Sequence, residues 1–373
     1  MIEHSSGKRN RIGNNPMDER DEATLAPVFV VSTGRCGSTL LSAMIRKHPQ
    51  LLSISEFFSY LGPGAVRAPR VSGEAAFRRL NTPGPGLRAF LESEASISEL
   101  VYPLDVGRRF SRQDVPPIMC TTLPHLTDDC EKLWDELGPE LRSRKRHRLM
   151  DHYRFVFEWL TRHFGRKLWV ERSGGTLPMS PVLARYFPDA RFVHIFRDGR
   201  DTALSMYNHP GFRAMAMTAS AFDRVGLDPF SPKNWRGSSP WVHIVAAIYG
   251  RFISPKRIMA ANVDLVTFGW LWSGMIKRGI EFLNTLPADQ VLSMRFESLL
   301  ESPQEEMTRF IEFVGPQLYD ARWLGEVSAL PRSTEPRWPR LGSVNQRRLA
   351  EACAPGQQIL GYNNEVVSHS QAG

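Results

Sequence analysis

One stretch near the N-terminus constrains the fold more than any other: an apolar run, a loop with two glycines, and a segment of helical periodicity. Residues 28–31 are all apolar and three are β-branched, which is typical of a strand buried on both faces. Residues 38–47 have the apolar spacing of a helix, and Pro49 lies just beyond its end. Such a loop turns backbone N–H groups toward one point, so the pattern predicts an anion site, above all a phosphate site.

The loop departs from the nucleoside triphosphate pattern G-x-x-x-x-G-K-[ST]. Aligned with this chain, the pattern places its lysine on Ser38 and its hydroxyl on Thr39, and the cation stands at Arg35 instead. The loop therefore suits one phosphate group beside a positive charge better than a triphosphate with Mg²⁺. A glycine turn that binds no ligand is the alternative for this stretch alone.

A second strand pattern covers residues 191–196 and ends at Arg197. Arginine presents a rigid pair of donors to a phosphate, and Ser205, in a following helix that Asp201 is predicted to cap, adds a hydroxyl. An Arg–Asp turn without a ligand is the alternative.

Together, the two stretches resemble the sulfotransferase family, which uses 3′-phosphoadenosine 5′-phosphosulfate (PAPS) as donor. Bacterial and Golgi-type members carry R-S-G-T-T-L-L where this chain has residues 35–41, and a helix ending in His-Pro follows in both. The resemblance runs from about Val28 to Tyr362. It implies that Arg197 and Ser205 bind the 3′-phosphate. It assigns the 5′-phosphosulfate to Thr33, Gly34, Arg35, Cys36, Gly37, Ser38, Thr39 and Leu40.

The resemblance also implies three catalytic residues. Glu56, just after a predicted strand at 51–54, matches the catalytic base of tyrosylprotein-type members; a carboxylate near a helix N-terminus is the alternative. Arg172 replaces the lysine of an E-K-T-P element and keeps its charge but cannot donate a proton; a surface ion pair with Glu171 is the alternative. Arg35 is expected to stabilise the leaving phosphate.

The implied fold is an α/β, P-loop NTPase-like three-layer sandwich with a central parallel sheet and helical insertions. We expect a disordered tail at 1–23, a sulfotransferase domain at 24–365 and a short tail at 366–373. Helices are predicted at 141–165, 262–286 and 303–313, and a strand at 291–294. An insertion at 60–140 is expected to serve acceptor recognition. A second insertion at 210–260, with Trp235 and Trp241, is expected to form a covering flap, and an apolar acceptor pocket is the alternative.

Net charge and cysteine content limit the possible partners and the cellular compartment. The net charge of +8 fits a donor with two phosphates and a sulfate, and no nucleic-acid motif is present. The basic run at 142–148 is typical of a solvated helix face, with a peripheral membrane contact as the alternative. The sequence has four cysteines without paired spacing, and we see no signal peptide and no apolar run of membrane-spanning length. We therefore expect a cytoplasmic protein with reduced cysteines. A helix N-terminus could lower the pKa of Cys36, but a simple replacement of the family's small serine is the favoured interpretation.

The sequence thus predicts a metal-independent, PAPS-dependent sulfotransferase with a Glu general base, acting on an acceptor hydroxyl or amine. A P-loop kinase, a non-catalytic 3′-phosphoadenosine nucleotide-binding protein, and an enzyme that sulfates an alcohol transiently before elimination remain alternatives. The sequence does not identify the acceptor, a small molecule or lipid: a lipid, quinone-like or natural-product alcohol and a sugar all remain candidates. The oligomeric state is also left open. The segment from Thr121 to His125 resembles the base motif T-H-L-P of cytosolic sulfotransferases, but it lies too far before Arg197, so His125 is predicted to be a loop residue.

Overall fold

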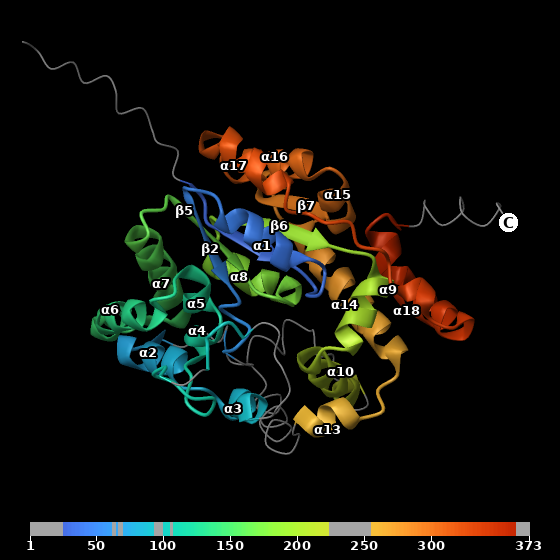
Figure 1. Ribbon diagram of the computed structural model, residues 1–373, viewed down its shortest axis with the longest axis horizontal. Coiled ribbons are helices and arrows are strands. Elements are labelled where there is room, and N and C mark those ends of the chain that lie inside the picture. The colour runs from blue at the N-terminus through green and yellow to red at the C-terminus, as the bar shows by residue number, and fades with distance from the viewer. Residues whose placement is uncertain are drawn as a thin grey trace, which may run out of the picture.

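A parallel sheet forms the centre of the computed structural model, which describes residues 25–61, 65, 70–92, 100–104, 107–223 and 255–362 (Figure 1). The sheet has five described strands in the order β2-β5-β1-β6-β7, all parallel. Their bounds are β1 Val28–Val31, β2 Leu51–Ser55, β5 Leu168–Arg172, β6 Arg191–Phe196 and β7 Val291–Arg295. The predicted α/β class with a central parallel sheet is confirmed.

Strand β1 lies in the middle of the sheet, and all of its residues are fully buried. Its alternate residues serve two separate cores: Val28 and Val30 face one, and Phe29 and Val31 the other. This is why the sequence shows a continuous apolar run there rather than an alternating pattern.

Helices cover both faces of the sheet. The core that includes Val30 is closed by α1 (Ser38–Arg46), α16 (Pro303–Val314) and α17 (Ala321–Ser328). The core that includes Phe29 is closed by α7 (Leu149–His163), α8 (Ser180–Tyr186), α9 (Gly199–Tyr207) and α14 (Leu265–Leu283). The three layers of the predicted sandwich are therefore present.

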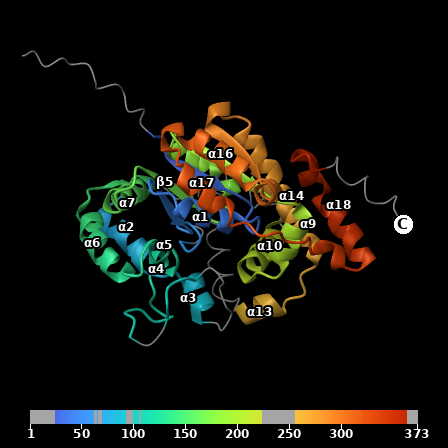
Figure 2. The same ribbon diagram turned by 45° about the horizontal axis from the view of Figure 1, so that its top comes forward.

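Two further groups of helices flank the sheet on opposite sides, as both views show (Figures 1 and 2). One group is α2 (Gly73–Asn81), α3 (Pro85–Glu92), α4 (Pro117–Cys120), α5 (Thr122–Leu126) and α6 (Cys130–Ser143), with a small antiparallel pair of strands, β3 (Arg70–Val71) and β4 (His147–Arg148). The other group is α10 (Pro210–Asp223), α13 (Pro255–Ala260) and α18 (Ser343–Ile359), while α15 (Phe296–Glu301) follows β7. These groups include much of the two predicted insertions.

The helix predicted at 141–165 is wrong in its first part. The preceding helix ends at Ser143, residues 144–148 leave the helical path to form β4, and the next helix starts at Leu149. The basic run at 142–148 is therefore not one helix face, because His147 and Arg148 pair with the distant strand β3. The predicted apolar face from Leu149 onward is confirmed, since Tyr153, Val156 and Leu160 are fully buried.

Several expectations concern residues outside the described part of the chain: the tails at 1–23 and 366–373, and Trp235 and Trp241. Among the helices that are described, none combines the length and apolarity that crossing a membrane requires.

Candidate active site

The loop between β1 and α1 forms the base of the site. Gly34, Arg35 and Gly37 all have positive φ angles, of 77°, 58° and 86°. A Cβ atom on Gly37 would lie 2.1 Å from the Phe296 ring, so this position requires glycine both for its backbone and for its space. No side chain caps α1 in the described structure, and its first N–H groups are thus available to an anion.

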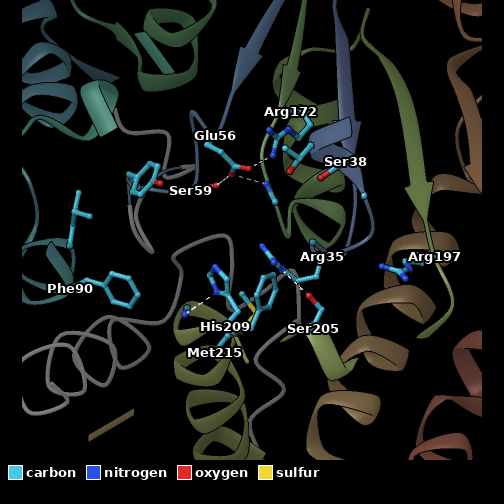
Figure 3. Close-up of a pocket in the computed structure, with 18 of the residues that line it drawn as sticks. Arg35, Ser38, Glu56, Ser59, Phe90, Arg172, Arg197, Ser205, His209 and Met215 are labelled. Carbon is cyan, nitrogen blue, oxygen red and sulfur yellow. Dashed lines mark hydrogen bonds and ion pairs between the residues drawn. The ribbon is translucent and has the colours of Figure 1, made fainter. Parts of the chain in front are cut away.

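Strand β6 and helix α9 bring a second set of polar groups to this loop. The Arg35 Nε donates to the Ser205 Oγ at 3.2 Å, which links the loop to α9. Arg197, at the end of β6, donates to Asp201 Oδ2 at 2.9 Å and lies over the Phe296 ring at 5.1 Å. Arg35, Arg197 and Ser205 therefore converge, as their assignment to one phosphate-rich ligand requires (Figure 3).

Asp201 does not cap α9, contrary to the prediction. Asp198 is the N-cap residue and accepts from the Arg200 N–H at 2.8 Å. Asp201, one turn in and buried, accepts instead from the backbone N–H groups of Arg337 and Trp338, at 2.8 and 3.0 Å. It thereby holds the C-terminal segment beside Arg197.

Glu56 directly follows β2, with a positive φ of 55° and a buried carboxylate. One carboxylate oxygen pairs with Arg172 Nη1. The other accepts from the Ser59 hydroxyl and, at 3.0 Å, from the Gly174 N–H. These contacts come from two neighbouring strand ends, β2 and β5, and fix the orientation of the carboxylate (Figure 3).

Arg172 is buried and does not form the surface ion pair with Glu171 considered from the sequence. Besides Glu56, it donates from Nη2 to Ser55 Oγ at 2.6 Å, while its Nε is buried without a hydrogen-bond partner in the described residues. Glu171 lies under the site and accepts from the Ser173 hydroxyl. Burial raises the pKa of Glu171 to about 8.

One pocket of about 610 Å³ unites most of the predicted site residues. The predicted residues that line it are Gly34, Arg35, Gly37, Ser38, Thr39, Glu56, Arg172, Arg197 and Ser205. Thr33, Cys36 and Leu40 do not line it, and both Thr33 and Cys36 are buried beneath the loop. Burial also raises the pKa of the Cys36 thiol, so the helix N-terminus does not make this cysteine acidic.

The other lining residues were not predicted individually, although most of them fall within the two insertions named from the sequence. Helix α3 contributes Leu87 and Phe90, and the start of α10 contributes His209, Phe212 and Met215 as neighbours on the opposite wall. In Figure 3, Phe90 lies toward one end of the pocket and Arg197 toward the other, with Glu56 between them. No local motif marks these apolar residues, because they meet only through the packing of distant helices. The hydroxyl at Ser59, three residues after Glu56, is the one signal that was available.

Residues 122–126 form the short helix α5, so the prediction of a loop at His125 is wrong. Thr122 donates to the Ser55 carbonyl at 2.9 Å, which anchors α5 under β2. Neither residue lines the pocket, in agreement with rejecting this segment as a base motif. Over the described ranges, no group of three or more His, Cys, Asp or Glu side chains is arranged to hold a metal ion.

Comparisons with known proteins find sulfotransferases. Residues 123–233, which include Arg172, Arg197 and Ser205, match the model of a sulfotransferase family. Similar solved structures include a sulfotransferase domain from the curacin biosynthetic pathway, at 16% identity and a TM-score of 0.44, covering 91% of this chain and 97% of that one. Others are a sulfotransferase domain of the Synechococcus PCC 7002 olefin synthase (16%, TM-score 0.42, covering 90% and 98%) and a sulfotransferase from Alicyclobacillus acidocaldarius (15%, TM-score 0.38, covering 91% and 95%). No curated protein sequence matches. The predicted resemblance to the sulfotransferase family is confirmed.

Proposed function

We propose that this protein transfers a sulfuryl group from PAPS to the hydroxyl, or the amine, of a small acceptor by in-line displacement. The observation that supports the proposal most is the meeting of three groups in one pocket: the anion-binding loop, the Arg197 and Ser205 pair, and the carboxylate of Glu56. The match of residues 123–233 to a sulfotransferase family supports the same general activity.

The two ends of the donor have separate partners in this proposal. The uncapped N-terminus of α1, with the hydroxyls of Ser38 and Thr39, binds the 5′-phosphosulfate, and Arg35 stabilises the charge that develops on the leaving phosphate. Arg197 and Ser205 bind the 3′-phosphate and so distinguish this donor from ATP. No lysine stands in the loop to hold a triphosphate, which disfavours the kinase alternative.

The donor supplies a sulfuryl group joined to a good leaving group, 3′-phosphoadenosine 5′-phosphate. As the acceptor oxygen bonds to sulfur and the S–O bond to the phosphate breaks, Glu56 takes the acceptor proton. Arg172, Ser59 and the Gly174 N–H hold the carboxylate in one orientation during this step. Arg172 stays charged throughout, so it acts by electrostatics and positioning, not as a proton donor.

The apolar end of the pocket favours an acceptor with an apolar body. Phe90 of α3 lies toward the end of the pocket away from Arg197. Leu87 of the same helix and Phe212 and Met215 of α10 also line the pocket, with Phe212 close to Gly34. An alkyl or aromatic alcohol would bury its body there and present its hydroxyl to Glu56. A sugar, whose many hydroxyls need polar partners, fits this lining less well.

Calorimetric binding of 3′-phosphoadenosine 5′-phosphate, 5′-AMP and ATP·Mg²⁺ tests the donor. We expect tight binding of the first and a preference over 5′-AMP that Arg197→Ala reduces about 10- to 100-fold, the value of a hydrogen bond to a charged group. Arg154→Ala, which removes a surface pair with Asp189 and no pocket residue, is the matched control. A preference for ATP·Mg²⁺, or no nucleotide binding, would overturn the proposal. Binding without turnover on any alcohol or amine would instead support a non-catalytic nucleotide-binding protein.

A further inference from the structure

A second cavity, of about 410 Å³, has one lining residue in common with the main pocket. Tyr60 lines both cavities, so a ligand that passes this side chain can occupy the two together. The second cavity is lined by residues of α2 and the segments next to it, among them Arg78, Arg79 and Thr82. None of these residues has a role in the donor site.

Arg79 faces inward from α2 and is half-buried. Burial raises the pKa of Tyr153, and Arg79 lies close enough to oppose that rise. The Arg79 Nε is buried without a hydrogen-bond partner among the residues that the structure describes, and no described carboxylate forms an ion pair with this side chain. A half-buried guanidinium that lines a cavity and that no described carboxylate neutralises is a favourable neighbour for an anion.

The mouth of this cavity also carries excess positive charge. Glu74 is 4.0 Å from Arg78 and 3.7 Å from Arg142, so one exposed carboxylate is shared by two guanidinium groups. Arg79, next to Arg78 on α2, adds a third positive charge to those of Arg78 and of Arg142 on α6. The local balance therefore attracts anionic groups.

We propose that this second cavity is an anion subsite for the far end of the acceptor. The acceptor is then an amphiphile: a hydroxyl at Glu56, an apolar body between α3 and α10, and a carboxylate, phosphate or sulfate at Arg79. This inference rests on the proposed sulfotransfer reaction. It adds a charge requirement that the donor site and the apolar lining do not impose.

Matched acceptors test the subsite: ω-hydroxydecanoate, n-decanol and ω-aminodecanol, which share chain length and hydroxyl but differ in end charge. We expect the hydroxy acid to have the highest kcat/KM, and Arg79→Gln to lower it about 10- to 100-fold, mainly through KM, while n-decanol is unaffected. Arg154→Gln is the control, since Arg154 pairs with Asp189 and lines neither cavity. Equal use of the three acceptors, or an Arg79→Gln effect of the same size on all three, would overturn the subsite.

A binding measurement separates failure of the subsite from failure of the reaction. Decanoate, which has no hydroxyl, should bind the wild-type protein in calorimetry, and Arg79→Gln should weaken it while 3′-phosphoadenosine 5′-phosphate still binds. If no acceptor is sulfated, the proposed reaction fails and decanoate binding alone decides the subsite: dependence on Arg79 supports it, and independence refutes it. Arg79→Lys, which keeps the charge, should retain most decanoate affinity and serves if the glutamine variant does not fold.

Discussion

Removing one partner of the Arg172–Glu56 ion pair should destabilise the fold far more than removing both. The two side chains are only 6% and 7% exposed, so each charge has lost nearly all of its water. Breaking a buried pair leaves one uncompensated charge and costs about 3–5 kcal/mol, whereas replacing both partners with neutral groups is often close to neutral. We therefore expect about 3–5 kcal/mol for Glu56→Gln and for Arg172→Met, and much less than their sum for the double variant.

The contacts that remain in each single variant predict which of the two loses more stability. After Glu56→Gln, Arg172 can still donate to Ser55 Oγ and to the neutral amide oxygen, but no charge compensates its own and it cannot become neutral. After Arg172→Met, the Glu56 carboxylate keeps both the Ser59 hydroxyl and the Gly174 N–H. Glu56→Gln should therefore be the more destabilising of the two.

Urea unfolding at neutral pH, followed by circular dichroism, measures the free energy of unfolding of the wild type, the two single variants and the double variant. These four proteins form a double-mutant cycle. The same cycle on Arg154 and Asp189, whose side chains are 29% and 52% exposed, is the control and should give a coupling of about 0–1 kcal/mol. Additive effects at Arg172 and Glu56, or single-variant losses below about 1 kcal/mol, would refute the reasoning, because the pair would then be solvated or absent.

Two further predictions concern the residues beneath the site. Burial raises the pKa of Glu171 to about 8, so between its ordinary value of 4.5 and 8 the folded state holds a proton that the unfolded chain has lost, and stability falls as the pH rises. Glu171→Gln should remove this loss of stability with rising pH. The loss is worth roughly 5 kcal/mol at most, from about 1.4 kcal/mol per pKa unit. If the free energy of unfolding in urea had the same pH slope in the variant and the wild type, the prediction would be wrong. Gly37→Ala should abolish nucleotide binding, because its Cβ would meet the Phe296 ring and its φ is 86°. Gly274→Ala, which has open space around it, is the control, and calorimetric binding that survives in Gly37→Ala would show that the loop tolerates a side chain.

The sequence predicted those parts of the fold that depend on local pattern. The apolar run at 28–31 is the central strand, and Arg197 and Glu56 stand at strand ends as expected. Parallel strands end at the same edge of a sheet, so residues that follow several such strands meet there without any further information.

What the sequence could not predict depends on contacts between distant segments. The pairing of Arg172 with Glu56, rather than with its neighbour Glu171, follows from the register of β5 beside β2. The break before Leu149 exists because β4 pairs with β3, which no helical pattern reveals. The apolar end of the pocket likewise requires α3 and α10 to face one another, although neither helix carries a motif.

The central position of β1 has a consequence for how the protein is made. This strand leaves the ribosome well before its two hydrogen-bonded neighbours, residues 168–172 and 191–196. Until those segments are synthesised, both edges of this apolar strand stay unpaired in the nascent chain, and the strand can associate with other chains. The phosphate loop that follows β1 cannot take its final shape before then, and it also needs Phe296 against Gly37. The proposed nucleotide binding should therefore require that Phe296 has already been synthesised.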